Sequence, residues 1–307
     1  RKTTSLNPDF AEAHSNLGLT LQILDRLEES EISCRKAIAL KPDFAQAHYN
    51  LAITLKELGR SEEAEASYTR VIALKPNFAE AHYNSGNMFK ELDRLQEAEA
   101  SYTKAIELKP DYIEAYYNLG ITHQALGRLD EAEVIFRQAV ALKPDYAEAH
   151  GNLGVSLKEL GRLNEAQTSL RQAIALKPNI AEAHYNLGIT LQELGKLEEA
   201  ETSYREAIAL NPTYTKAHDF LLWCLYLLDK KSLFFNELDY LISQDKASAV
   251  IGSFTCRSAL KYGIEKPNIF CQEPLKYILH VDLNTRYDFK EFFVKKVKSI
   301  LNENRML

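Results

Sequence analysis

The sequence predicts an all-α protein in which tandem helix-turn-helix repeats stack into a solenoid. Proline recurs every 34 residues, at Pro8, Pro42, Pro76, Pro110, Pro144, Pro178 and Pro212. A near-copy of A-E-A-H-Y-N-L-G follows each of these prolines, and a glycine or an aspartate punctuates the middle of most repeats. Because a unit of this length cannot bury its apolar face alone, its neighbours must complete the core.

The period divides the chain into repeats with definite boundaries. Six full repeats are expected at 11–44, 45–78, 79–112, 113–146, 147–180 and 181–214. Residues 1–10 align with the end of a preceding repeat, so the chain is expected to open inside a truncated one. Residues 215–244 are predicted to form a degenerate seventh repeat or cap. Residues 245–307 are predicted to form a mainly helical segment or a linker to a missing domain.

Each repeat is predicted to hold two helices, and positions are counted here from the first residue of a repeat. Helix A should cover positions 1–14, and a turn should follow at Gly59, Asp93, Gly127, Gly161 or Gly195. Helix B should end at the leucine before Lys-Pro or Asn-Pro, since proline and glycine punctuate helices.

The core face of helix A follows from a rotation of about 100° per residue. Positions 4, 7, 8, 11 and 14 share one arc, which in repeat 6 holds His184, Leu187, Gly188, Leu191 and Leu194. Gly188 is expected to oppose Ala200 of helix B and to let the two backbones approach closely. A bulkier residue there should destabilise the fold by about 1–3 kcal/mol through overpacking.

These features resemble the tetratricopeptide repeat. The resemblance is carried by the period, by L-G near the start of each unit, by a small residue twelve positions later and by proline before the next copy. It implies a right-handed superhelix whose concave groove, built from helix A, binds a protein or peptide partner. Positions 2, 5, 6, 9, 12 and 13 face away from the predicted core, and this is the side that lines the groove in the family.

The sixth position of every repeat is asparagine, at Asn16, Asn50, Asn84, Asn118, Asn152 and Asn186. An amide both donates and accepts, so a regular file of amides suits the backbone of an extended peptide. The A helices should lie about 8–10 Å apart, and an extended peptide rises about 3.3 Å per residue. One asparagine would therefore contact the peptide every few residues. This groove resembles the repeat region of O-GlcNAc transferases. The alternative is that these amides bond neighbouring helix carbonyls and bind no ligand.

The fifth and ninth positions add an aromatic and aliphatic surface. Tyrosine occupies position 5 at Tyr49, Tyr83, Tyr117 and Tyr185, and position 9 holds Ile53, Asn87, Ile121, Val155 and Ile189. Tyrosine gives contact area at low entropic cost and a polar hydroxyl. The alternative is packing between repeats. A carboxylate clamp of the chaperone type needs basic residues at position 5, so recognition of an acidic C-terminal peptide is disfavoured.

No metal or cofactor is expected. Histidine recurs at position 4, but successive A helices lie at least a helix diameter of about 10 Å apart, whereas ligands must lie about 2.1 Å from a shared ion. The histidines are therefore interpreted as packing residues. No nucleophile elbow, phosphate loop or dinucleotide fingerprint occurs, so this chain is predicted not to be an enzyme.

Charge, apolar runs and cysteine content indicate which partners are disfavoured and where the protein is located. Residues 1–214 hold 23 basic and 32 acidic side chains, which disfavours nucleic acid as a ligand. The longest apolar run, Phe220–Leu228, is too short for a membrane span, which needs about 18 residues. The four cysteines form no C-x-x-C pair, which favours reduced thiols and a cytoplasmic location.

The last third departs from the repeat. Residues 215–229 are predicted to form a helix that is apolar nearly all round, followed by helices at 232–243 and near 246–262. An extended run at 277–283 and a helix from about 289, capped by Asp288 and Glu291, are predicted to follow. Residues 264–303 resemble the segment that joins repeats to a 2-oxoglutarate/Fe(II) oxygenase domain in some marine bacterial proteins. His280 and Asp282 spell H-x-D, but no later histidine follows, so such a domain would begin after Leu307.

The sequence therefore predicts a scaffold that holds an extended segment of a partner protein in the groove. The alternative is the substrate-recruiting arm of an oxygenase or glycosyltransferase whose catalytic domain lies beyond residue 307. A third interpretation is self-association through exposed repeat ends. The partner's identity, its peptide sequence and the biological process are not given by the sequence.

Overall fold

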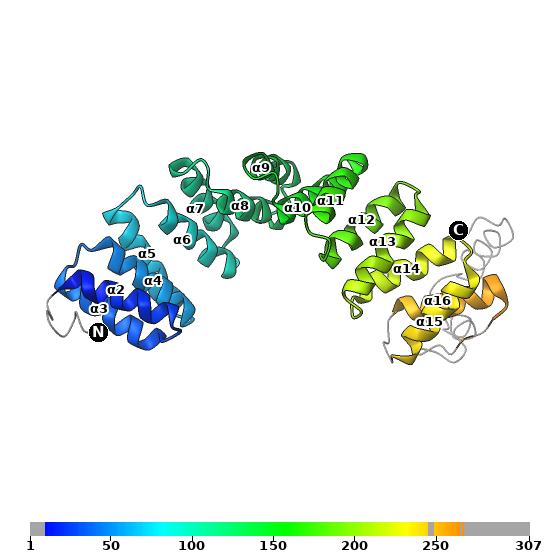
Figure 1. Ribbon diagram of the computed structural model, residues 1–307, viewed down its shortest axis with the longest axis horizontal. Helices are drawn as coiled ribbons and strands as arrows, with labels where there is room; N and C mark the ends of the chain where they lie inside the picture. The colour runs from blue at the N-terminus through cyan, green and yellow to red at the C-terminus, as the bar shows by residue number, and fades with distance from the viewer. Residues whose placement is uncertain (1–9, 245–248, 265, 267–307) are drawn as a thin grey trace, which may run out of the picture. The chain divides into compact units, whose positions relative to one another are not determined.

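The structure is a computed structural model that describes residues 10–244, 249–264 and 266. Every regular element in these residues is an α-helix, and the helices follow one another in pairs (Figure 1). The A helices are α2 (Ala11–Ile23), α4 (Ala45–Glu57), α6 (Ala79–Glu91), α8 (Ile113–Ala125), α10 (Ala147–Glu159), α12 (Ala181–Glu193) and α14 (Thr215–Leu227). The B helices are α3 (Leu27–Leu40), α5 (Ser61–Leu74), α7 (Leu95–Leu108), α9 (Leu129–Leu142), α11 (Leu163–Leu176), α13 (Leu197–Leu210) and α15 (Lys231–Ser243). A final helix is α16 (Ala249–Tyr262).

The chain divides into two compact units, Arg1–Leu176 and Lys177–Leu307. In the first unit each helix packs against the next, and successive A helices also touch, as α2 does α4 and α6 does α8. In the second unit α12 packs on α13 and α14, and α16 contacts both α14 and α15. The all-α fold of tandem helix pairs predicted from the sequence is confirmed.

The turn between the two helices of a pair uses a left-handed residue. Gly59 has φ 74°, and its N–H donates to the Lys56 carbonyl at 2.9 Å, while the N–H of Arg60 donates to the Leu55 carbonyl at 2.9 Å. This is the Schellman arrangement, which satisfies the last carbonyls of a helix and favours glycine. Asp93 takes the same conformation with φ 58°, as aspartate can.

The core lies between helices A and B, where an aromatic or aliphatic residue at position 24 meets a small residue at position 8. Tyr68, Tyr102, Phe136, Leu170 and Tyr204 are all at most 1 % exposed. A Cβ atom added at Gly188 would lie 2.5 Å from the Tyr204 ring. The three atoms nearest to this added Cβ all belong to the Tyr204 ring, which therefore fills the space beside Gly188.

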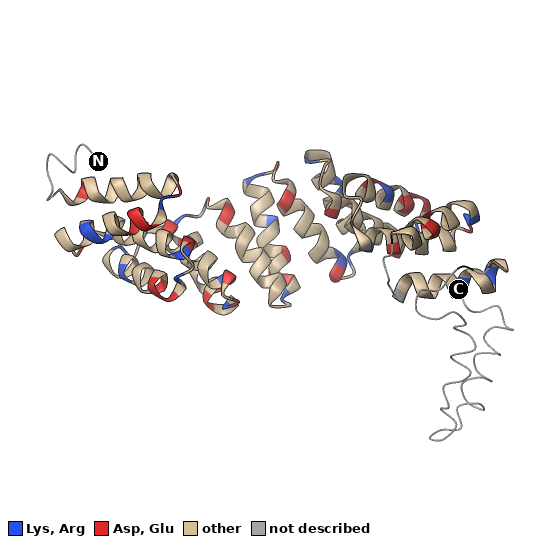
Figure 2. Ribbon diagram, turned by 90° about the horizontal axis from the view of Figure 1, so that it is seen from below, with Lys and Arg blue, Asp and Glu red and all other residues tan. Residues whose placement is uncertain are grey.

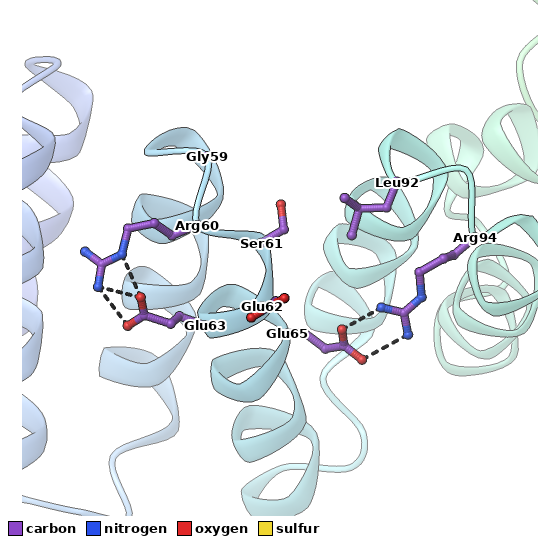
Figure 3. A pocket seen from close by; sticks show the side chains of 8 residues that line it. All are labelled: Gly59, Arg60, Ser61, Glu62, Glu63, Glu65, Leu92 and Arg94. Carbon is purple, nitrogen blue, oxygen red and sulfur yellow. Dashed lines mark hydrogen bonds and ion pairs between the residues drawn. The ribbon is translucent and has the colours of Figure 1, made fainter.

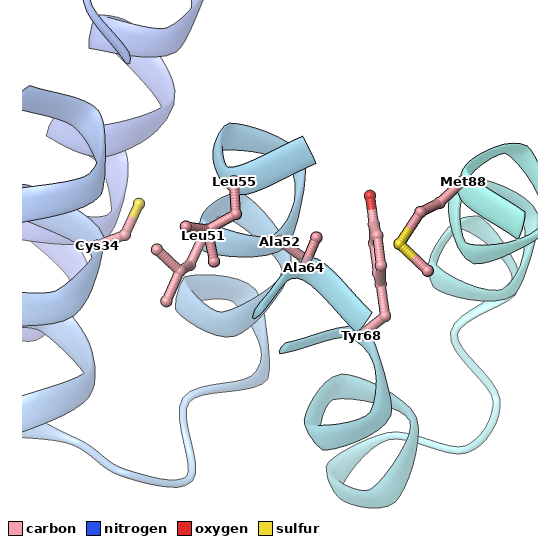
Figure 4. Close-up of a cluster of buried hydrophobic side chains, with 7 residues drawn as sticks. All are labelled: Cys34, Leu51, Ala52, Leu55, Ala64, Tyr68 and Met88. Carbon is pink, nitrogen blue, oxygen red and sulfur yellow. The ribbon is translucent and has the colours of Figure 1, made fainter. Parts of the chain in front are cut away.

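Neighbouring repeats share their apolar residues, as the predicted stacking requires. One cluster joins Cys34 of α3, Leu51 and Leu55 of α4, Tyr68 of α5 and Met88 of α6 (Figure 4). Its members are at most 4 % exposed. Since the cluster draws on three successive repeats, removing any one repeat would expose apolar surface on the next.

The predicted apolar helix at 215–229 is present as α14, and its aromatic residues join it to α15 and α16. The ring of Phe254 lies 5.8 Å from that of Trp223 and 5.7 Å from that of Phe234. The helix predicted near 246–262 is present as α16 from Ala249 on, and residues 245–248 lie outside the described ranges. The expected extended run at 277–283, the helix from 289 with its capping pair, and the His280–Asp282 motif also lie outside them.

Candidate functional site

The sequence points to the exposed side of the A helices, which we call the A-helix face and define by positions 5, 6, 9 and 12. In the first unit the side chains at these positions come from α2, α4, α6, α8 and α10. Most of them are partly buried, so each has one side against the core and another toward solvent.

The structure brings the predicted asparagines and tyrosines together across the joints between repeats. In the first unit the position-6 amide of one repeat donates from Nδ2 to the position-5 hydroxyl of the repeat before it. Asn84 donates to Tyr49 at 2.6 Å, Asn118 to Tyr83 at 3.0 Å and Asn152 to Tyr117 at 3.1 Å. Because the amide nitrogen can only donate, each hydroxyl oxygen acts as the acceptor in this bond.

The tyrosine rings also pack between repeats. The ring of Tyr49 lies 4.8 Å from that of Phe78 and 6.4 Å from that of Tyr68. Tyr83, Tyr117 and Tyr185 repeat this arrangement with the corresponding aromatic residues. Burial raises the pKa of Tyr49, and the hydrogen bond from Asn84 partly opposes that rise. The rings therefore help to hold the joints, which is the packing role weighed from the sequence.

The remaining asparagines differ in burial or in partner, although Asn50 too donates to a position-5 hydroxyl, that of Ser15. Asn50 is 1 % exposed and donates to the carbonyl and hydroxyl oxygens of Ser15 at 3.2 and 3.1 Å. Asn186 is 7 % exposed and donates to the Glu182 carbonyl of its own helix at 3.0 Å. Asn16 is exposed on α2. Among the six, the combination of partial exposure with the bond to tyrosine belongs to Asn84, Asn118 and Asn152.

In two of these three amides the side-chain oxygen is available to accept a hydrogen bond from a ligand. Within the part of the chain that the structure describes, the Oδ1 atoms of Asn84 and Asn152 accept no hydrogen bond. Their nitrogens are held by the tyrosine hydroxyls, so the orientation of each amide is fixed. A fixed carbonyl-type oxygen is suited to accept a hydrogen bond from a peptide N–H.

Position 9 supplies the predicted aliphatic surface with one polar exception. Ile53 and Ile121 are partly buried against the core clusters, and Val155 and Ile189 are also partly buried. Asn87 takes this position in repeat 3, where its Oδ1 accepts from the Tyr102 hydroxyl at 2.8 Å and from Asn118 Nδ2 at 3.3 Å.

Position 12 was predicted to lie on the groove side of helix A, but its residues were not singled out as site residues. Lys56 Nζ lies 2.7 Å from Glu91 Oε1, and Lys90 Nζ donates to Asn118 Oδ1 at 2.8 Å. Gln124 donates to the Asn152 carbonyl at 3.2 Å and to the Ser156 hydroxyl at 2.8 Å. These long side chains reach the next repeat and line the edge of the A-helix face.

The recurrent histidines hold the loop that precedes their helix. The Nε2 atoms of five of them lie 2.9–3.1 Å from the carbonyl oxygen of the proline six residues earlier: His48, His82, His150, His184 and His218. A carbonyl only accepts, so Nε2 carries the hydrogen. This supports the packing interpretation. Among the described residues no group of three or more potential ligands could hold a metal ion.

A pocket of about 660 Å³ lies away from the A-helix face, between the turns of repeats 2 and 3 (Figure 3). Its guanidinium groups are already engaged. Arg60 binds Glu63 and Glu31, and Arg94 binds Glu65 and Glu97. Basic and acidic residues both occur along the repeats in Figure 2, and Arg128 and Arg162 also pair with a glutamate of the preceding repeat. The pocket is therefore lined by ion pairs that link successive repeats. We call this series the ion-pair ladder; it consists of Arg60–Glu31, Arg94–Glu65, Arg128–Glu99 and Arg162–Glu133.

The helices of the described residues include none that is long and apolar enough to cross a membrane. Three of the four cysteines lie in these residues, and Cys34 and Cys224 are buried free thiols.

Solved structures with the same arrangement of helices are found by comparison. YrrB, a TPR protein with an unusual peptide-binding site, is 27% identical with a TM-score of 0.55, over 60% of this chain and 95% of that one. PilF of Pseudomonas aeruginosa is 19% identical with a TM-score of 0.60, over 68% of this chain and 96% of that one. PilW, a type IV pilus biogenesis factor, is 20% identical with a TM-score of 0.58, over 68% and 97%. No curated protein matches the sequence.

Family models describe the repeats directly. Models of the tetratricopeptide repeat match residues 11–44, 45–78, 113–146 and 181–214, and a further TPR repeat model matches residues 86–127 and 156–195. Together they cover more than half of the chain, and the four 34-residue matches coincide with helix pairs of the structure. The repeats form a scaffold of the kind typical of protein–protein interaction, and the chain belongs to the tetratricopeptide repeat family.

Proposed function

We propose that this protein binds an extended segment of a partner protein along the A-helix face. The observation that carries the proposal is the ladder of amides at Asn84, Asn118 and Asn152, each oriented by a tyrosine hydroxyl of the preceding repeat. The oxygens of Asn84 on α6 and Asn152 on α10 accept nothing from the described residues and lie two repeats apart, with Asn118 of α8 between them. Such a file suits main-chain N–H groups of an extended peptide, whatever its side chains.

The aromatic and aliphatic residues beside the ladder would supply contact area. Tyr49, Tyr83 and Tyr117 are partly exposed, and the position-9 residues Ile53, Ile121 and Val155 lie one helical turn further along their helices. The nearly buried residues Asn50 of the first unit and Tyr185 and Asn186 of the second would contribute to packing more than to direct contact. YrrB, a protein built from the same repeat, has a peptide-binding site, which is consistent with this use of the fold.

The test is a selection from a phage-displayed library of random peptides on the purified protein, followed by titration of the selected peptides. The double variant Asn84→Ala, Asn152→Ala should weaken peptide binding by about tenfold or more, the usual cost of two hydrogen bonds to a ligand.

The matched control is the double variant Tyr49→Phe, Tyr117→Phe. It loses the same two bonds between repeats, and with them the fixed orientation of both amides, but keeps both amide oxygens and both rings. Its stability should fall similarly, while its binding should fall by less than that of the alanine double variant. Equal loss of binding in the two double variants, or no selected peptide at all, would contradict the proposal.

A further inference from the structure

A polar network at the joint between repeats 3 and 4 sets this part of the A-helix face apart. Asn118 Nδ2 donates to the Tyr83 hydroxyl at 3.0 Å and to Asn87 Oδ1 at 3.3 Å, and Tyr102 donates to the same Asn87 oxygen at 2.8 Å. These donors and acceptors fix the amide so that its oxygen meets Lys90 Nζ at 2.8 Å. The ammonium can only donate, which settles which end of the Asn118 amide faces it.

Lys90 differs from the other position-12 lysines of the first unit in its partner. Lys56 is paired with Glu91 at 2.7 Å and Lys158 with Glu159 at 3.0 Å. Within the described residues, Lys90 has no carboxylate within ion-pair distance, and its one partner is a neutral amide oxygen. An ammonium group has three donors, so two remain for a ligand.

The partly buried ammonium group of Lys90 would be stabilised by an anionic ligand. The side chain is partly buried, and burial lowers the pKa of its ammonium group, while the nearby Glu91 opposes that change and Lys56 adds to it. A partly desolvated cation gains more from an added negative charge than an exposed one does. The equivalent joints lack this feature, because Ile53 and Ile121 replace Asn87 and the local long side chains are already paired or neutral.

We propose that Lys90 and Asn87 form a subsite for one aspartate or glutamate side chain of the bound peptide, with Asn118 holding the Lys90 ammonium in place. This inference rests on the proposed function, since it names the side chain that an extended peptide would place at the third joint. A carboxylate carries one negative charge, which matches one ammonium. A phosphate carries close to two, which a single lysine beside Glu91 would balance poorly.

The experiment repeats the library selection with wild type and with Lys90→Gln. Wild-type protein should enrich peptides that share an acidic residue at one register, and Lys90→Gln should enrich peptides without that preference. Lys158→Gln is the matched control, because it removes a position-12 lysine of the same unit that already has a carboxylate partner. It should keep the acidic preference.

A thermodynamic cycle then tests the contact itself. The selected peptide is synthesised with an amidated C-terminus, both with its acidic residue and with the corresponding amide residue. Replacing the acidic residue of the peptide by its amide should lower the affinity for wild-type protein by about tenfold or more. The same replacement should change the affinity for Lys90→Gln little, because that variant has already lost the charge-assisted hydrogen bond.

The outcomes separate the two proposals. If wild type enriches no peptides, the proposed function fails. If peptides are enriched without an acidic preference, if Lys90→Gln keeps that preference, or if a free C-terminal carboxylate is required in place of the side chain, the subsite is wrong while the binding face stands.

Discussion

Asn118 and Tyr83 join two successive repeats by a side-chain hydrogen bond of 3.0 Å between Nδ2 and the hydroxyl oxygen. They are 35 residues apart, one full repeat and one position further. The same pair of positions is bonded at the joints on either side, by Asn84 with Tyr49 and by Asn152 with Tyr117. The residues predicted to bind a ligand therefore also link the repeats, and stability and binding must be measured separately.

Replacing Tyr83 by phenylalanine should lower the free energy of unfolding by about 0.5–1.5 kcal/mol, the usual net value of a hydrogen bond. The variant keeps the ring packing but leaves Asn118 Nδ2 with only its longer bond to Asn87. Urea unfolding followed by circular dichroism measures the change. Tyr116→Phe is the control on a neighbouring A helix, since no hydrogen bond of its hydroxyl is found in the described residues. Equal effects of the two substitutions would argue against a stabilising role for the Tyr83 bond.

Replacing Gly120 by alanine should destabilise the protein by about 1–3 kcal/mol, as overpacked cores do. The added Cβ would lie 2.6 Å from the Phe136 ring. Gly151→Ala is the opposite case on the next A helix, where the nearest atom would be 3.9 Å away. Alanine should there stabilise the helix by about 0.5–1 kcal/mol. Thermal unfolding of both variants tests the difference in sign, and a stabilised Gly120→Ala would be inconsistent with the observed packing.

Stability should fall in alkali, partly because of Cys34. Burial raises the pKa of the Cys34 thiol to about 11, from an ordinary value of 9.0. The unfolded chain therefore releases this proton first, so the stabilising contribution is complete below pH 9.0 and is lost as the pH rises toward 11. Unfolding by urea at about pH 8 and about pH 10.5 measures the loss. Cys34→Ala should lose less than wild type over that interval, and an equal loss would remove Cys34 as a contributor.

Stability should also fall in acid, through Glu31 of the ion-pair ladder. Burial opposes ionisation of Glu31, but hydrogen bonds from Arg35 and Arg60 outweigh it and lower the pKa of the carboxyl below 4.5. A lowered pKa stabilises the fold above that value, and the contribution is lost as the pH falls below it. Urea unfolding of Glu31→Gln should therefore show a smaller loss of stability than wild type between about pH 6 and about pH 3.

The control for Glu31 is Glu28→Gln on the same helix, an exposed carboxylate that makes no ion pair within the described residues. It should follow wild type in acid. The difference between wild type and Glu31→Gln should also shrink in about 1 M salt, where charges on the surface are screened. A difference that is independent of salt would point to packing instead of charge.

The repeats could be predicted from the sequence because their signals are local. Pro42, two residues after Leu40, and the left-handed Gly59 end their helices whatever the surroundings. The 34-residue period then gives the place of every later turn. The face of helix A followed from the rotation per residue. What could not be predicted was how far a long side chain extends across that face.

Two contacts illustrate this limit. The Tyr204 ring lies 2.5 Å from a Cβ added at Gly188, and the period gives the side of a helix but not how far such a ring extends. Lys90 was not predicted because its importance depends on Asn87 and Asn118 of two repeats and on which carboxylates lie within reach, and only the three-dimensional contacts reveal these. The binding role of the asparagines and tyrosines stays a prediction.

The bond from five of the position-4 histidines to a proline carbonyl has a consequence for acid conditions. The donor is Nε2, so protonation adds its hydrogen at the other ring nitrogen and leaves a bond such as that from His150 to the Pro144 carbonyl intact. For His218, Nδ1 faces Glu237, and a protonated ring would gain an ionic partner there. Each of these bonds keeps its donor hydrogen when the ring gains a second proton, so the loop stays bonded to its helix in both forms.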